Sequence, residues 1–513
     1  MYHRDDSGEV TLRPDAAGGS IELARDFILP DSYADVKKVL GVTAMLSPGG
    51  GYTEEGKAYY SGEVIAEVLF VTDEGGSVVL PCTIPYEGAV AIGSEEGLYE
   101  TVFLPSIDSL SARAVNPRKL GVKVRLEPSL VSFEERDAYV GFEDGLTEDD
   151  LDSFMEKTEP FSYLSARHIF TQGIEAGDDI TLDEAYLPIS SLLGSDVRFS
   201  KVTAEAREDG VAVSGNADVT VLYKNETGEP VMRKHTLPVS TLVPCEGVGE
   251  GDAVLVKLYC QGVSCKAGEN AAGEARVIEL DFTYSVEGAA MRKEEGRAVK
   301  DLYSTRYECE NREKALPVPS LVGSVSTAVR LVGEMNCEEK GVVLGSYGDL
   351  SPLRFADHGD GVALEGALTL TVILLGDEGE IFSRTLEMPI LYPLTDSFVG
   401  RPELLSSMTL DEARVTLSGD LLSAEVSVGL SALLWEVKKE EMIVSTKVTS
   451  ELERENSSLF TVYFPSAKED AWEIAKRYRV SEDRLIFSEN GGGHRRVLIL
   501  PDGRKPLYRG RTE

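Results

Sequence analysis

Three copies of one residue spacing organise this chain of 513 residues. In each copy a glycine is followed 13 residues later by a second glycine and 23 residues later by a proline. The sets are Gly62, Gly75 and Pro85; Gly215, Gly228 and Pro238; and Gly366, Gly379 and Pro389. A block that recurs without gaps indicates several copies of one structural unit. Because the copies begin about 150 residues apart, each is expected to be a domain rather than a short solenoid repeat.

The residue pattern of each copy predicts a β-hairpin. In the second copy, residues 213–223 alternate apolar and polar side chains, which is typical of a half-buried strand. The turn cluster KNETGE follows, with Gly228 supplying a positive φ, and residues 230–239 return as a second strand. Pro238 is expected to end that strand or to lie at a sheet edge, because proline cannot donate to the ladder.

A hairpin cannot stand alone, so each copy needs further strands. Alternating segments at residues 120–133, 276–286 and 423–438 supply them, each about 55 to 65 residues beyond the first glycine of its copy. The predicted fold class is therefore mainly β, with three repeated β-sandwich-like or open-barrel domains of roughly 120 to 150 residues.

Short helices are also expected. The segment DSYADVKKVLGV places Val36, Val39 and Leu40 at helical spacing behind Ser32 as N-cap. Residues 188–194 and 320–333 are weaker counterparts before the second and third copies, with an edge strand as the alternative.

A separate helix is expected between the first and second copies. Thr147 and Asp150 are spaced like a capping box, and Leu151, Phe154 and Met155 would share one helix face. This pattern predicts a surface helix in an acidic linker.

The net charge of −37 is unevenly spread. Residues 459–513 carry 11 Lys and Arg against 8 Asp and Glu, whereas the preceding 458 residues carry 40 against 80. An acidic body disfavours nucleic acid and anionic membrane surfaces as partners, and the different sign of the C-terminal part suggests a different partner surface. The N-terminus has no apolar core of a secretory signal, and no run of 18 apolar residues predicts a membrane span. These features predict a cytoplasmic protein.

Motifs that carry catalytic chemistry are missing from the sequence. There is no phosphate loop, HExxH or GxSxG, and the glycine-rich segment GVGEGD at residues 247–252 is expected to be a turn rather than a nucleotide site. The six cysteines are too sparse for a disulfide framework, and small buried side chains are a better interpretation of them than metal ligands. We therefore expect no enzyme activity, no cofactor and no metal.

Residues 459–501 read as β-α-α-β. LFTVYF is a strand, EDAWEIAKRY is an amphipathic helix, VSEDRLIFSEN opens with Ser481 as N-cap of a second helix, and RRVLILP is a closing strand. The pattern resembles a LysM module. The matching residues are Phe460, Val462, Trp472, Ile474, Ala475, Tyr478, Val480, Leu485, Asn490, Leu498, Ile499 and Pro501.

One departure from the LysM pattern bears on its ligand. Where the family has Gly-Asp-Thr-Leu, this chain has Lys468, Glu469, Asp470 and Ala471. In LysM modules this loop and the loop before the last strand flank the glycan groove, so the resemblance implies that the scaffold is kept while the sugar-contacting loop is rebuilt.

The three β repeats followed by a LysM-like module resemble the SPOCS-repeat spore coat morphogenetic proteins of clostridial type. The resemblance implies a non-enzymatic scaffold for spore coat assembly on the mother-cell side of the forespore surface, whose LysM-like module binds the morphogenetic ATPase of the coat basement layer. The implied domains are residues 1–140, 141–310 and 311–450 for the three repeats, 459–501 for the module and 502–513 for a basic tail.

The predicted contact surface consists of the two loops at residues 465–471 and 490–496. Its residues are Lys468, Glu469, Asp470, Asn490, His494, Arg495 and Arg496. Predicted structural residues are Gly62, Gly75, Gly215, Gly228, Gly366, Gly379, Trp472, Ile474, Tyr478 and Leu485. Two alternatives stay open: a cell-envelope protein that binds peptidoglycan or another N-acetylglucosamine glycan, and an enzyme with a dispersed site.

Overall fold

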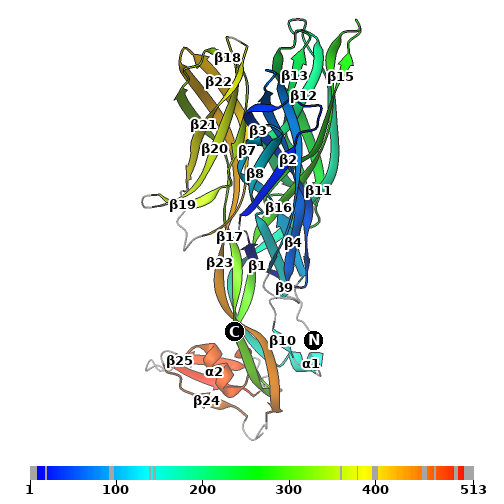
Figure 1. Ribbon diagram of the computed structural model, residues 1–513. Coiled ribbons are helices and arrows are strands. Elements are labelled where there is room, and N and C mark those ends of the chain that lie inside the picture. Colours follow the sequence, from blue (N-terminus) through cyan, green and yellow to red (C-terminus); the bar gives the residue numbers. More distant parts are fainter. Residues whose placement is uncertain are drawn as a thin grey trace.

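The computed structural model of the chain is mainly β (Figure 1). It describes residues 9–17, 20–91, 98–137, 140–142, 146–358, 361–377, 379–394, 402–452, 459–466, 469–489 and 495–501. The α-helices in this part of the chain are α1 (Glu148–Leu151) and α2 (Ala471–Tyr478), and neither is long and apolar enough to cross a membrane.

Each sequence copy supplies the central strand of an antiparallel sheet. The strand orders are β3-β4-β5, β12-β13-β14 and β18-β20-β21, with β19 also paired to β20. The bounds are β3 (Val36–Glu54), β4 (Lys57–Thr72), β5 (Ser77–Ala91), β12 (Ile189–Arg207), β13 (Gly210–Asn225), β14 (Pro230–Pro244), β18 (Gly341–Leu350), β19 (Arg354–His358), β20 (Gly361–Gly376) and β21 (Ile381–Pro393).

The landmark residues occupy equivalent positions in the three hairpins. Gly62, Gly215 and Gly366 each stand opposite the residue that follows the landmark proline, namely Tyr86, Val239 and Ile390. The prolines lie on β5, β14 and β21, which flank the central strands and have no further sheet neighbour among the described residues. Proline is tolerated on an edge strand because no further strand requires a hydrogen bond from its nitrogen, which carries no hydrogen. The predicted hairpins and their edge prolines are confirmed.

The turn glycines are equivalent as well. Gly75, Gly228 and Gly379 have φ of +87°, +84° and +83°. Each donates its backbone N–H to the carbonyl three residues earlier, at 3.0, 2.9 and 2.9 Å respectively. These values of φ are left-handed, where a side chain is strained, so the sequence spacing reflects a backbone requirement.

A second sheet accompanies each hairpin sheet. The strand orders are β2-β8-β7, β11-β16-β15 and β17-β23-β22. The bounds are β2 (Ile21–Ile28), β7 (Ser106–Asn116), β8 (Lys119–Glu127), β11 (Phe154–Thr181), β15 (Ala253–Glu269), β16 (Ala275–Ser304), β17 (Tyr307–Asn336), β22 (Glu403–Ser418) and β23 (Leu421–Glu451). The segments expected to close each copy begin in β8, β16 and β23, the central strands, so the same order recurs three times. The end of the first segment, residues 130–133, lies instead in β9 (Leu130–Asp137) of another sheet.

We refer to the sheet pairs as units 1, 2 and 3, in chain order. Unit 1 has a further sheet of order β1-β9-β6, formed by β1 (Glu9–Ala17), β9 (Leu130–Asp137) and β6 (Leu98–Phe103). The apolar core of unit 1 continues into its neighbours, because Leu164 and Tyr259 of unit 2 and Trp435 of unit 3 belong to the same buried cluster. The units therefore share packing.

The helix expected after Ser32 is wrong. Val36 begins strand β3, with Val36 opposite Thr72 and Val39 opposite Phe70. The local pattern of this segment is compatible with a helix, but its β-branched valines fit a pleated surface. Pairing with β4 therefore makes the segment a strand. Residues 189–194 and 320–333 are likewise strand, in β12 and β17, which is the alternative that the sequence left open.

The linker helix exists but is short. In α1, the Asp150 carboxylate accepts from the backbone N–H of Thr147 at 3.0 Å and from its hydroxyl at 2.7 Å. The helix ends at Leu151, and Phe154 already belongs to β11, so the predicted shared helix face with Phe154 and Met155 is wrong. Phe154 pairs with Ser304 instead, in a long ladder that outweighs a second helical turn.

Four strands run far beyond the sandwiches. Strands β11, β16, β17 and β23 have 28, 30, 30 and 31 residues, which corresponds to lengths of about 100 Å. Their ends form what we call the stalk: residues 154–163, 294–304, 307–318 and 437–451. Figure 1 shows the stalk as a narrow ribbon leading from the broad sandwiches to the C-terminal module. Phe154, Val299, Leu302 and Ile443 pack inside it, beside Phe142 of β10 (Gly141–Phe142).

Candidate partner-binding site

The C-terminal module contains three strands and one helix. Strands β24 (Thr461–Tyr463), β26 (Arg495–Ile499) and β25 (Leu485–Glu489) form a sheet in that order, with α2 on one side. The second helix expected from residue 481 is wrong: a single 3-10 turn (Glu482–Arg484) leads directly into β25. Leu485, Ile486 and Phe487 pair with Ile499, Leu498 and Val497, so these β-forming residues extend the sheet.

The apolar side of α2 forms the module core, as predicted. Trp472 and Ile474 are buried together with Ala475, Val480, Leu485, Val497 and Ile499, and Tyr478 packs against them. Helix α2 begins with a capping box, in which Asp470 accepts from the backbone N–H of Glu473 at 2.8 Å and Glu473 accepts from that of Asp470 at 3.3 Å. This box satisfies backbone donors at the helix start.

The two acids predicted to contact a partner serve the module itself. Glu469 accepts from the backbone N–H of Ser466 at 2.9 Å, from the Tyr463 hydroxyl at 2.8 Å, and pairs with Arg477 at 2.6 Å. The Ser466 hydrogen bond is the main reason that the pKa of Glu469 lies below its usual range. Asp470 caps α2. These contacts give both residues a structural role that the sequence did not indicate.

The other predicted contact residues are only partly described. Lys468, Asn490 and His494 lie outside the described residues, as does the side chain of Arg495. Arg496 is exposed on β26, and its Nε donates to the Ser488 hydroxyl at 3.2 Å. Of the predicted basic surface, the structure thus places one guanidinium.

The helix side of the module is anchored to the stalk. The Trp472 ring meets Tyr303 edge-on, with ring centroids 4.9 Å apart, and its Nε1 donates to Asp301 at 2.7 Å. Lys476 donates to the other Asp301 oxygen at 2.6 Å, and the buried Tyr303 hydroxyl donates to the Val480 carbonyl at 2.7 Å. Burial of Asp301 acts to raise its pKa, but the hydrogen bonds from Lys476 and Trp472 outweigh it and hold that pKa below its usual range.

Two ion pairs flank this contact. Lys157 of β11 lies 3.2 Å from Asp470, and Arg479 lies 2.5 Å from Glu308 of β17. Arg479 is the left-handed C-cap residue of α2, with φ of +53°. Asp301, Tyr303, Lys157 and Glu308 were missed by the sequence reasoning because they lie more than 150 residues before α2 in ordinary alternating strands. These contacts with the stalk determine which side of the module remains accessible to a partner.

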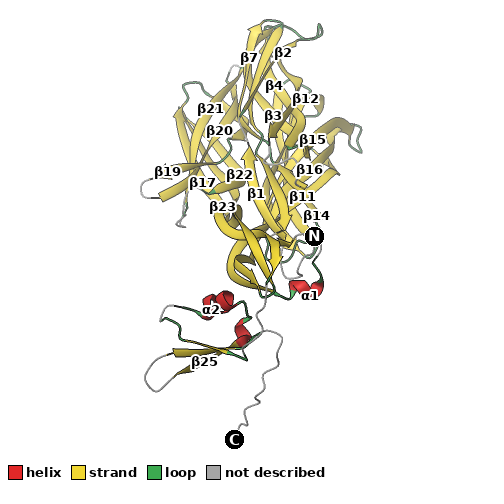
Figure 2. Cartoon of the chain, turned by 90° about the horizontal axis from the view of Figure 1, so that it is seen from below, coloured by secondary structure: helices red, strands yellow, loops and turns green. Residues whose placement is uncertain are grey.

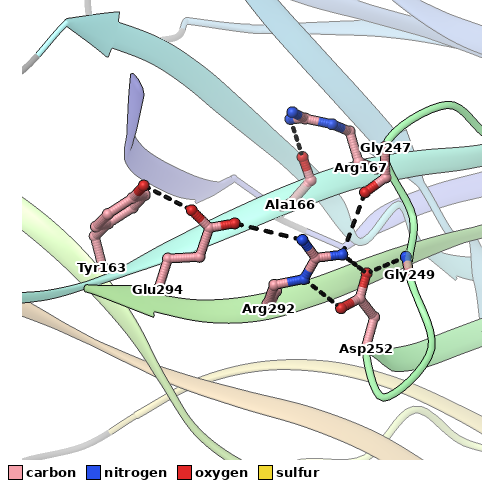
Figure 3. Close-up of polar contacts among 8 residues, drawn as sticks. All are labelled: Tyr163, Ala166, Arg167, Gly247, Gly249, Asp252, Arg292 and Glu294. Atoms are coloured by element: carbon pink, nitrogen blue, oxygen red, sulfur yellow. Dashed lines mark hydrogen bonds and ion pairs between the residues drawn. The ribbon is translucent and has the colours of Figure 1, made fainter. Parts of the chain in front are cut away.

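The glycine-rich segment at residues 247–252 is a turn, as expected, and Figure 3 shows what closes it. Arg292 of β16 donates to both oxygens of Asp252, at 2.6 and 2.7 Å, and to the Gly247 carbonyl at 3.3 Å. Asp252 also accepts from the Gly249 N–H at 3.0 Å, and Glu294 links Arg292 to the Tyr163 hydroxyl. The guanidinium is neutralised by carboxylates of this chain, so the network fastens the loop to the sandwich.

Charged groups of all three units meet at a partly buried site between the units. Arg198 of β12 lies between Asp196 at 2.7 Å and Asp349 of β18 at 3.3 Å. Glu67 of β4 lies nearby, and burial, reinforced by the charge of Asp196, raises its pKa to about 8. Asp196 and Asp349 thus share one guanidinium, and Glu67 lies close enough to Asp196 for their charges to interact. We call these four residues the junction cluster. No set of three His, Cys, Asp or Glu residues suited to a metal ion occurs in the described ranges.

Residues 188–267 match the family model described as SipL, SPOCS domain. The match spans the hairpin sheet of unit 2 and most of β15, and it contains Gly215, Gly228 and Pro238. The chain therefore contains a SPOCS domain, which supports a sporulation-related protein. No curated protein and no solved structure matches the chain.

Proposed function

We propose that this protein is a non-enzymatic scaffold for spore coat assembly at the forespore surface, and that its LysM-like module binds a protein of the coat basement layer. The SPOCS match supports the sporulation context. The hairpin register that units 1 and 3 share with the matched segment supports a repeated scaffold.

The proposed binding role of the module rests on one observation: the module is attached to the far end of the stalk. The contacts of Asp301 and Tyr303 hold the helix side against the stalk, and α2 lies between the stalk and β25 (Figure 2). A small surface held about one stalk length from a large body suits the presentation of a recognition site to another macromolecule. The proposed partner is the morphogenetic ATPase of the basement layer, in the mother-cell cytoplasm.

The loop chemistry favours a protein partner over a glycan. Glu469 is engaged by Tyr463, Ser466 and Arg477, and Asp470 caps α2 and meets Lys157. These acids stand where LysM modules that bind sugar have Gly-Asp-Thr-Leu, so the loop is used to build and anchor the module.

The test measures two kinds of binding with the full-length chain. Immobilised chain is titrated with purified basement-layer ATPase, and the same preparation is co-sedimented with peptidoglycan sacculi. We expect saturable binding of the ATPase and no enrichment with sacculi. Enrichment with sacculi without ATPase binding would replace the scaffold proposal with the cell-envelope alternative.

A further inference from the structure

Exposed apolar side chains gather on the C-terminal module. Phe460, Val462, Phe464 and Ile486 have exposed fractions of 51, 43, 60 and 48%. Elsewhere in the described chain, large exposed apolar side chains are scattered through the three units. Scattered examples need no explanation, whereas a contiguous patch marks an interaction surface.

The strand register makes these side chains neighbours. Val462 stands opposite Leu498, and Leu498 stands opposite Ile486, so the three cross the whole sheet in one row. Tyr463 and Val497, the next residues along β24 and β26, belong to the module core on the α2 side. Because successive side chains alternate between faces, the row lies on the face away from α2. We call Val462, Leu498 and Ile486, with Phe460 and Phe464 beside them in sequence, the outer row.

The opposite side of the module is already occupied. Trp472 and Lys476 contact Asp301, and Val480 accepts from Tyr303, so the stalk lies against α2 and the residues that follow it. The outer row has no such cover among the described residues. Figure 2 shows α2 between the stalk and β25, with the sheet on the outside.

Charge indicates the kind of partner. Among the paired residues of β24, β25 and β26 on the outer face, the charged side chain is Arg496, which is exposed two residues before Leu498. A partner that places an acidic side chain beside its apolar ones would satisfy this guanidinium. A second copy applied through the same face would bring two Arg496 side chains to one interface, so self-association is less favourable.

We propose that the outer row is the docking surface for an amphipathic partner segment that combines apolar side chains with an acidic residue for Arg496. This inference rests on the proposed function and moves the contact from the two loops to the open face of the sheet. The aromatic side chains Phe460 and Phe464 are suited to anchor such a segment, since large aromatic groups dominate interface energies.

The experiment titrates full-length variants with the purified basement-layer ATPase. Val462→Ser combined with Ile486→Ser removes apolar area from side chains that are already exposed, so the fold is kept. Arg496→Glu reverses the charge, and Arg496→Lys keeps it. Val332→Ser, at a position of unit 3 that is 63% exposed, is the matched control for loss of an exposed apolar group. Near-ultraviolet circular dichroism and thermal melts check that each variant is folded.

We expect the double variant and Arg496→Glu each to weaken binding at least about tenfold, with Arg496→Lys and Val332→Ser within about twofold of the unaltered chain. If the unaltered chain binds and the double variant binds equally well, the outer row is not the surface and the proposed function survives. If the unaltered chain does not bind, both proposals fail. Sedimentation that shows self-association abolished by the double variant would overturn the acidic-partner proposal in favour of a second copy.

Discussion

The indole Nε1 of Trp472 donates to the carboxylate of Asp301 at 2.7 Å, across 171 residues of sequence. The second oxygen of the same carboxylate accepts from Lys476, one helical turn further along α2. A single acid of the stalk therefore holds two successive points of one helix. This pairing turns a separate module into a fixed extension of the β scaffold.

Replacing Asp301 should loosen the module without unfolding it. Asp301→Ala removes both hydrogen bonds, and because water still reaches part of this site we expect a loss of about 1 to 2 kcal/mol of docking free energy. Hydrogen exchange of residues 471–480 should accelerate, while exchange in β13 stays unchanged. Since the pKa of Asp301 is lower when docked, its contribution is present above the unfolded pKa and is lost as the pH falls through the docked pKa. Equal protection in the variant and the unaltered chain would contradict the anchor.

Two substitutions of Trp472 should separate packing from docking. Trp472→Ala removes a buried ring and is expected to destabilise the module by about 3 to 5 kcal/mol. Trp472→Phe keeps a ring against Tyr303 but loses the donor to Asp301, so the cost should be smaller and confined to the module–stalk contact. Thermal unfolding and hydrogen exchange distinguish the two. If both variants cost the same, the hydrogen bond has no separate role.

The turn glycine of unit 2 offers a clean test of backbone strain. Gly228 has φ of +84° and open space where a Cβ would be, so Gly228→Val should cost about 1 to 3 kcal/mol through backbone conformation alone. Gly262 also has open space but no positive φ, which makes Gly262→Ala the matched control, with little expected change. Chemical denaturation measures both. Gly75 and Gly379 should behave like Gly228, and a neutral effect at all three would contradict the turn geometry.

The junction cluster should make stability depend on pH. Glu67 has a pKa of about 8 in the folded chain, against an ordinary glutamate pKa of 4.5. Its folded pKa is raised, so its stabilising contribution is complete below about pH 4.5 and is lost as the pH rises through about 8. A shift of this size corresponds to roughly 3 to 5 kcal/mol. Glu67→Gln should therefore gain stability relative to the unaltered chain between pH 5 and 9, as measured by denaturant unfolding at each pH.

The control for this pH profile is Glu63→Gln, an exposed residue on the same strand. Its profile should run parallel to that of the unaltered chain. A parallel profile for Glu67→Gln as well would mean that Glu67 is ionised at neutral pH in the folded protein.

Local chemistry made the hairpins predictable from the sequence. Gly228 provides a positive φ in the turn, and Pro238 requires an edge strand that has no neighbour on its outer side. Both requirements apply at fixed positions of the hairpin, so they produce a fixed residue spacing in the sequence. Helical spacing after Ser32 and after Ser481 was misleading for a physical reason. Val36 and Ile486 satisfy a helical pattern, but their strand partners, Thr72 and Leu498, lie beyond the reach of one helical turn, 36 and 12 residues further along the chain.

The candidate site was predictable in its core and not in its surroundings. Trp472, Ile474, Ala475 and Tyr478 were identified as core because they recur at helical spacing, three or four residues apart, in a short amphipathic helix. The partners of that helix, Asp301 and Tyr303, belong to β16, whose alternation looks the same in the sandwich and in the stalk. Which strands extend beyond their sandwich into the stalk depends on pairing between distant segments. The local sequence of a strand does not indicate that pairing.

The continuity of the stalk strands has a mechanical consequence. Strand β23 pairs with β17 from Glu451, beside the module, to Leu421, at the far end of unit 3. Tension applied to the module along the stalk would pull β23 lengthwise against this ladder, whose hydrogen bonds run perpendicular to the strands. Such a pull shears many bonds at once instead of opening them one by one. A pull on the module would therefore be resisted along the whole length of the β17–β23 ladder.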